Sequence, residues 1–183
     1  MTVVVITPPE PVVTFAEVAK HLADVPAEDQ AYVEGLTAAA TDWAAMWLRR
    51  AIGVHLLELQ LADWPCDDFD LVRPMIEIES VTYVDPDGAT HEWDFPPLPW
   101  SEGVPRVRGR PGDLRIRYWA GYCKREPDDE GNWITDVPAP IKVAIMMLVA
   151  QWYNTRENVI TGTITSEMPF AVDALLQPFR VYR

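Results

Sequence analysis

The sequence predicts an α+β fold that is mainly α, with a small antiparallel β region inserted between two helical segments. Three patterns predict it: helical spacing of apolar residues over 27–52, alternating residues between 54 and 122, and an apolar helix after Pro138. The 183 residues are 49% hydrophobic and 23% charged, as in folded proteins of one-domain size. We therefore expect one domain: a helical core (14–53 and 138–157), a β-rich insertion (54–122) and a C-terminal docking tail (158–183).

The two N-terminal helices have clear boundary signals. Thr14 and Glu17 match a capping box, in which each side chain accepts a hydrogen bond from a free amide of the first turn. This box opens a short helix that we expect to end near Leu22. A longer helix is predicted from Ala27 to Ile52, because Pro26 precedes it and Gly53 offers a stop. Its apolar stripe consists of Val33, Leu36, Ala40, Trp43 and Trp47.

The β region is predicted from residues of alternating character. Leu57, Leu59 and Leu61 alternate with more polar neighbours, and the apolar residues of 76–83 lead into a turn candidate at 85–88, which indicates a hairpin.

A second alternating segment follows a proline-rich stretch. Residues 95–100 are expected to form a loop, because proline lacks the donor that a central strand needs. Residues 114–119 then predict a strand with one apolar face and one basic face, the latter carrying Arg115 and Arg117.

The helix after Pro138 is apolar on nearly every side. Beyond its main stripe, Val143, Met146 and Met147 are apolar too. Such a helix is either central in the core or shared with another subunit. Met146 and Met147 are therefore candidate subunit-interface residues.

Charge is unevenly distributed along the chain, whose net charge is −13. Residues 1–104 hold 19 acids and 4 bases, whereas residues 105–183 hold 9 acids and 11 bases. Seven bases fall within twenty residues, namely Arg106, Arg108, Arg110, Arg115, Arg117, Lys124 and Arg125. A nucleic-acid groove could use such a stripe, but the net charge opposes a phosphate polymer. A solvated strand face or a subunit contact through Arg115 and Arg117 fits better.

No catalytic, cofactor or metal site is predicted. The three histidines (His21, His55 and His91) lack a second ligand at metal spacing, and the acidic runs 67–70 and 128–130 do not follow a calcium-loop pattern. Phosphate-loop and nucleophile-elbow motifs are missing too. Because a hydrolase or transferase of this size usually shows at least one such motif, we expect a protein that is not an enzyme.

Cys66 and Cys123 are expected to be free thiols, and no segment is long and apolar enough to span a membrane.

Several segments, taken in order, resemble one family. They are Ile6–Leu22, the long Ala-rich helix, Val137–Tyr153, the Asn154–Asn158 run and Thr161–Gly162. Together they look like the head-tail connector (adaptor, or head-completion) family of tailed bacteriophages and phage-like particles.

The resemblance implies a structural role without enzymatic activity or cofactors. Family members form a ring of about twelve copies that joins the portal protein to the stopper or tail-terminator protein and lets double-stranded DNA pass without sequence recognition. We therefore expect a homo-oligomer in the virion neck, made in the bacterial cytoplasm and not bound to membrane. The family's portal contact would fall on Phe179, Arg180, Val181, Tyr182 and Arg183, with the loop 159–168 as a second candidate.

The residues themselves fit this expectation. The C-terminal tail has no obvious partner in its own chain, and eight tryptophans are many for this length. Three alternatives remain open at this point: a stopper or tail-completion protein, a DNA-packaging accessory that uses the arginine stripe, and a metal-dependent hydrolase that uses the acidic runs.

Overall fold

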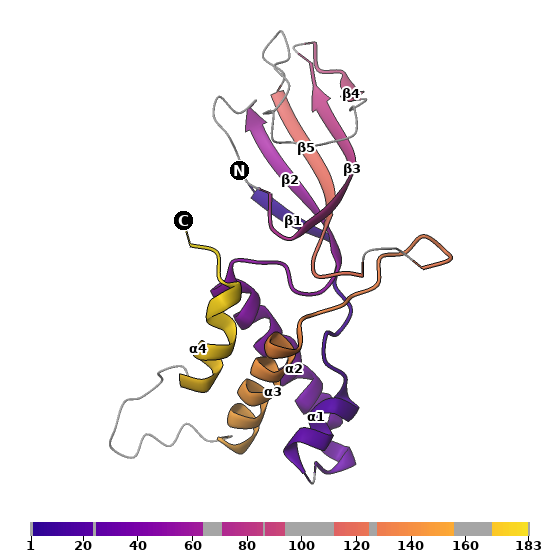
Figure 1. Cartoon of the computed structure of the whole chain (residues 1–183). Helices are drawn as coiled ribbons and strands as arrows, with labels where there is room; N and C mark the ends of the chain where they lie inside the picture. The colour runs from indigo at the N-terminus through magenta and orange to yellow at the C-terminus, as the bar shows by residue number, and fades with distance from the viewer. Residues whose placement is uncertain are drawn as a thin grey trace. The chain divides into compact units, whose positions relative to one another are not determined.

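The computed structural model describes residues 2–23, 25–63, 71–85, 87–93, 112–124, 128–155 and 170–182. The chain divides into two compact units. The sheet unit consists of residues 1–9 and 54–121, and the helical unit consists of residues 10–53 and 122–183. Figure 1 shows the helices and strands of each unit. In the part of the chain that is described, no helix is both long and apolar enough to cross a bilayer.

The expectation of a mainly helical fold is wrong. Of the described residues, 41% are helical and 29% lie in strands, so the fold is α+β with a substantial sheet. One strand that the alternation did not reveal is β1 (Thr2–Thr7). Because Val3, Val4, Val5 and Ile6 are apolar without interruption, the segment has no period-two signal.

The described part of the sheet unit forms a five-stranded antiparallel sheet. After β1 come β2 (His55–Asp63), β3 (Met75–Val84), β4 (Thr90–Glu92) and β5 (Gly112–Ala120), arranged in the order β1-β2-β5-β3-β4. One face is apolar and buried, with Leu57, Leu59, Leu61, Val81, Leu114, Ile116 and Tyr118. The prediction that Arg115 and Arg117 lie on the opposite, exposed face of their strand is confirmed.

A buried carboxylate lies among the polar residues of the sheet. Glu58 is only 3% exposed and stands opposite Arg117 in the β2–β5 register. Its Oε1 accepts a hydrogen bond from Gln60 Nε2 at 2.7 Å, and its Oε2 accepts one from Arg117 Nε at 2.7 Å. The Gln60 hydrogen bond, followed by the Arg117 contact, lowers the pKa of Glu58 despite the burial of its carboxyl group.

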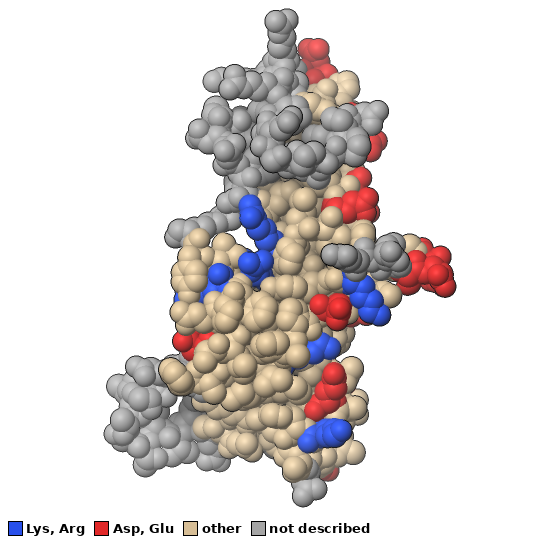
Figure 2. All heavy atoms as spheres, viewed as in Figure 1, with Lys and Arg blue, Asp and Glu red and all other residues tan. Residues whose placement is uncertain are grey.

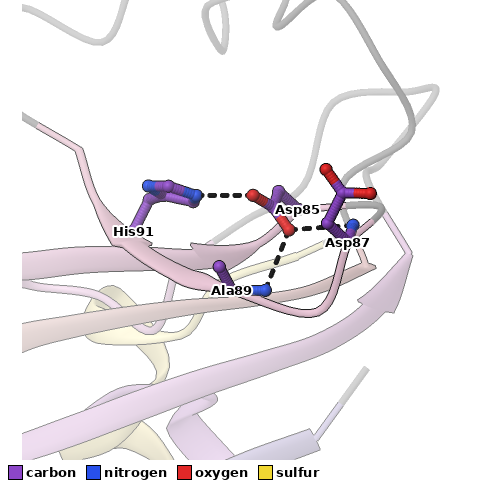
Figure 3. Close-up of polar contacts among 4 residues, drawn as sticks. All are labelled: Asp85, Asp87, Ala89 and His91. Atoms are coloured by element: carbon purple, nitrogen blue, oxygen red, sulfur yellow. Dashed lines mark hydrogen bonds and ion pairs between the residues drawn. The ribbon is translucent and has the colours of Figure 1, made fainter.

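The hairpin predicted around residues 85–88 is confirmed, and it joins β3 to β4. Figure 3 shows Asp85 at its centre: Oδ1 accepts hydrogen bonds from the amides of Asp87 at 2.9 Å and Ala89 at 2.8 Å. Oδ2 lies 2.6 Å from Nε2 of His91. Gly88 has a φ of +85°, which a residue without a side chain adopts most readily.

The helical unit begins with the predicted capping box. Thr14 N donates to Glu17 Oε2 at 2.7 Å and Glu17 N donates to Thr14 Oγ1 at 3.3 Å, which opens α1 (Phe15–Leu22). A 3₁₀ turn (Ala27–Asp29) leads into α2 (Gln30–Leu48). The helix ends before the predicted Ile52 because Arg49 adopts the left-handed conformation, with a φ of +54°.

Two further helices are described in this unit. They are α3 (Ala139–Asn154) and α4 (Phe170–Leu176), and a 3₁₀ turn (Gln177–Phe179) follows α4. The core lies between α2 and α3, with α4 and residues from α1 packed against it; its fully buried members include Val33, Ala40, Ala44, Leu48, Ile141, Ala144, Ile145, Val149, Val172 and Leu176. Small residues on the facing sides of α2 and α3 allow the two helix axes to approach closely.

We expect Glu58→Gln to lower the free energy of unfolding by about 1 kcal/mol at neutral pH, because the charged hydrogen bonds to a buried group are weakened. The pKa of Glu58 is lowered in the folded state, so its stabilisation is present above the unfolded pKa and is lost as pH falls through the folded pKa. Urea unfolding at several pH values measures this. Asp113→Asn is the control, since Asp113 meets Arg115 only at the surface; equal losses in both variants would contradict the prediction.

We expect Asp85→Ala to speed hydrogen exchange at the amides of Asp87 and Ala89, because both lose their acceptor. The His91 contact and the two amides lower the pKa of Asp85. The protection should therefore fade in the wild type as pH drops through that lowered pKa. Asp87→Ala is the control, because its carboxylate forms no hydrogen bond within the described part of the hairpin. Unchanged exchange at Ala89 in Asp85→Ala would refute this role.

Candidate functional site

Residues that could support catalysis or metal binding are not brought together in the described part of the chain. No three metal-ligating side chains cluster there. In the acidic run 128–130, the Asp128 carboxylate accepts hydrogen bonds from the amides of Asn132 at 2.7 Å and Glu130 at 3.0 Å. This carboxylate therefore closes a turn. The run 67–70 lies outside the described residues.

One of the two cysteines can be placed. Cys123 is a free, half-buried thiol, and burial together with the nearby Asp136 raises its pKa. A raised pKa leaves the sulfur protonated and weakly nucleophilic at neutral pH. Cys66 lies outside the described residues.

The C-terminal segment, predicted to contact a portal, is anchored on the end of α2. Arg50 Nε donates to the Phe179 carbonyl at 2.6 Å, and Val181 N donates to the Leu48 carbonyl at 3.1 Å. Phe179 also packs against the helical core. The expectation that this tail has no partner in its own chain is therefore wrong. Its last residue, Arg183, lies outside the described residues.

Arg180 lies between these two anchored residues and joins an aromatic cluster. Its guanidinium carbon is 4.4 Å from the Trp47 ring centre and 5.4 Å from the Tyr182 ring centre, both within cation–π range. Tyr182 is 65% exposed. We call Trp47, Arg180 and Tyr182 the C-terminal cluster. Arg180 forms no ion pair with any of the residues that are described.

The sequence did not reveal this cluster. Trp47 falls on the apolar stripe of its helix and was expected in the core, where it packs only in part. Trp, Tyr and Arg are the residue types enriched at the centres of protein interfaces. That enrichment is the one sequence signal that could have pointed to these residues, but it does not say which tryptophan meets which arginine.

The candidate interface residues of α3 lie at the edge of the core. Met146 and Met147 are half-buried and pack against it, whereas Val143 on the same helix is 37% exposed. Residues 143, 146 and 147 are three or four apart, so they share a face of α3. Figure 2 shows a broad area without charged side chains over the helical unit on the face in view.

Strand β1 is an exposed apolar edge. It pairs with β2 on one side and is the outermost strand of the described sheet on the other. Val3, Val4, Val5 and Ile6 are between 36% and 54% exposed. An apolar edge strand of this kind readily pairs with another chain unless something covers it.

The two arginines proposed for a subunit contact have partners in their own chain. Arg117 is bound to Glu58, and Arg115 NH2 lies 3.8 Å from Asp113 Oδ2, where both side chains are exposed. Arg115 is therefore the more available of the two. Arg106, Arg108, Arg110 and Arg125 lie outside the described residues.

No family model and no curated protein matches the sequence. Solved structures do match the fold. A chain in the virion of a native gene transfer agent particle aligns with a TM-score of 0.73 and 22% identity, covering 100% of this chain and 97% of that one. Two further matches have TM-scores of 0.70 and 21% identity, with the same coverage: the neck of an empty gene transfer agent particle computed with C6 symmetry, and the neck of a native particle computed with C12 symmetry. The chain therefore shares its whole fold, sheet unit and helical unit alike, with chains of these particles.

Proposed function

We propose that this protein is a structural adaptor that forms a ring in the neck of a tailed phage or phage-like particle, between the portal vertex and the stopper or tail. The observation that carries the proposal is the match to chains of neck assemblies over the full length of this chain and 97% of theirs. The residues that we quoted for the adaptor family point the same way.

The exposed apolar surface supports assembly. The edge strand β1 and the isolated side chains of Met46 and Phe170, which are 72% and 87% exposed, are left uncovered in a single copy. Neighbouring copies related by rotation would cover such surface through a heterologous contact, which closes into a ring. We assign the subunit contact to Met146 and Met147 of α3 together with Arg115 and, less directly, Arg117.

The net charge suits a passage for DNA. Each copy carries −13, so a ring is strongly anionic and offers few cationic partners to phosphates. Double-stranded DNA would pass without being held or read. In this assignment the partners are further copies of the chain, a portal protein and a stopper or tail-terminator protein.

We place the portal contact on Phe179, Arg180, Val181, Tyr182 and Arg183. Because Phe179 and Val181 are fixed to α2, the side chains available to a partner are chiefly those of Arg180 and Tyr182. A stopper or tail-completion role is the second candidate. The five-stranded sheet favours it, since such proteins are expected to be richer in β structure.

Particles assembled without this protein should contain separate heads and tails, because nothing would join the two. Electron microscopy of particles from a deletion strain measures this, and restoring the gene is the control. Cross-linking of intact particles then separates the two candidates: cross-links from Arg180 or Tyr182 to the portal support the adaptor, and cross-links only to tail proteins support the stopper. Normal tailed particles in the deletion strain would contradict both.

We expect Val143→Glu to weaken self-association by about tenfold, because a charge replaces an apolar side chain at a buried contact. Its effect on the unfolding midpoint should be small, since Val143 is exposed in a single copy. Met146→Glu and Met147→Glu should weaken both properties, because these side chains also pack against the core. Sedimentation and thermal unfolding measure the two quantities. Gln151→Glu, at an exposed position of the same helix, is the control.

For each variant, the change in self-association is compared with the change in the unfolding midpoint. Loss of assembly without loss of stability in Val143→Glu supports a subunit contact on this face. Unchanged self-association of all three variants would show that the α3 face is not part of the ring contact.

A further inference from the structure

The C-terminal cluster holds the half-buried Arg180 guanidinium in position, and no described residue forms an ion pair with it. Two aromatic rings lie within cation–π distance of Arg180. The residues on either side of it are held by hydrogen bonds: the Phe179 carbonyl accepts one from the Arg50 side chain, and Val181 N donates one to the Leu48 carbonyl. Contacts with ring faces do not use the N–H donors of a guanidinium, which point outward in its plane. These donors form a fork that fits a carboxylate or a phosphate with two parallel hydrogen bonds.

We propose that Arg180 is the anchor that binds a carboxylate side chain of the portal protein, with Trp47 and Tyr182 holding its guanidinium in place. This inference rests on the proposed function and adds the chemistry by which the partner is recognised. The Arg180 head group would form a bidentate ion pair with an Asp or Glu of the partner. The exposed Tyr182 ring would then exclude water from that pair.

Charge and composition favour a protein carboxylate over DNA phosphate. The chain carries 28 acidic and 15 basic residues, so a DNA backbone is repelled as a whole. Arg180 is in contact with the rings of Trp47 and Tyr182, and Arg, Trp and Tyr are residue types enriched at protein interfaces. A phosphate site would be expected to carry further cations arranged along a groove. Arg50 lies close by, but its Nε donates to the Phe179 carbonyl.

Preorganisation explains why this arginine is suited to the role. A free arginine side chain loses about 2 kcal/mol of rotamer entropy when it is fixed. Arg180 has already given up part of that freedom by lying against Trp47. Arg49, exposed at the end of the same helix, has no ring contact among the described residues. It is therefore the matched control.

The test measures binding of the full-length protein to purified portal protein of the same particle. We expect Arg180→Ala and Arg180→Lys each to weaken binding by about tenfold or more, because lysine keeps the charge but cannot form the bidentate fork. Tyr182→Phe should bind normally and Tyr182→Ala should not, since the ring and not the hydroxyl is used. Arg49→Ala should remain within about twofold of the wild type. Circular dichroism checks that each variant is folded.

The outcomes separate the inference from the proposed function. Normal portal binding by both Arg180 variants would overturn the anchor role and leave the adaptor role standing. A wild type that does not bind portal would overturn the portal contact and, with it, this inference. If Arg180→Ala binds portal normally but no longer binds a short DNA duplex, the site is one for phosphate. If Arg180→Ala loses only self-association, the site binds a second copy of the chain. Either result contradicts the proposal.

Discussion

The structure depends on the pairing of β2 with β5. These strands are antiparallel, with His55 opposite Ala120, so the inserted segment returns to the place where it left the helical unit. There, Tyr122 N donates to the Ile52 carbonyl at 2.9 Å and Asp136 N donates to the Tyr122 carbonyl at 2.9 Å. Because both ends of the insertion meet, helices from the two ends of the chain can share one core. The loop-closure entropy of bringing α2 to α3 is offset by the long strand pairing between them.

The same arrangement decides which surfaces the protein can offer. The sheet has one apolar, buried face, while β1, the outermost strand of the described sheet, has an edge that pairs with no described strand and carries exposed valines. The helical unit buries one side of α3 and leaves Val143 exposed. The described part of each unit therefore combines a buried apolar side with exposed apolar residues. Repeated copies cover exposed apolar residues of this kind in a closed assembly.

Local signals predicted the elements that depend on neighbouring residues. The Thr14 capping box, the turn at Asp85 and the two-faced strand around Arg117 each follow from residues a few positions apart. The size of the sheet could not be predicted in this way, because β1 is apolar throughout and its strand character comes from pairing with β2. The C-terminal cluster was equally inaccessible: the contact of Arg180 with Trp47 depends on tertiary packing, and the tail was wrongly expected to lack a partner.

An anchored C-terminal segment is better suited to binding than the free tail that the sequence suggested. When a disordered tail binds a partner, it loses the conformational entropy of every residue that becomes ordered, and this loss weakens binding. Here α4 packs on the core, and Phe179 and Val181 are hydrogen-bonded to Arg50 and Leu48 before any partner arrives. Only the exposed side chains remain to be ordered. If the segment binds a partner as proposed, the contacts that hold it to its own chain also lower the entropic cost of that binding.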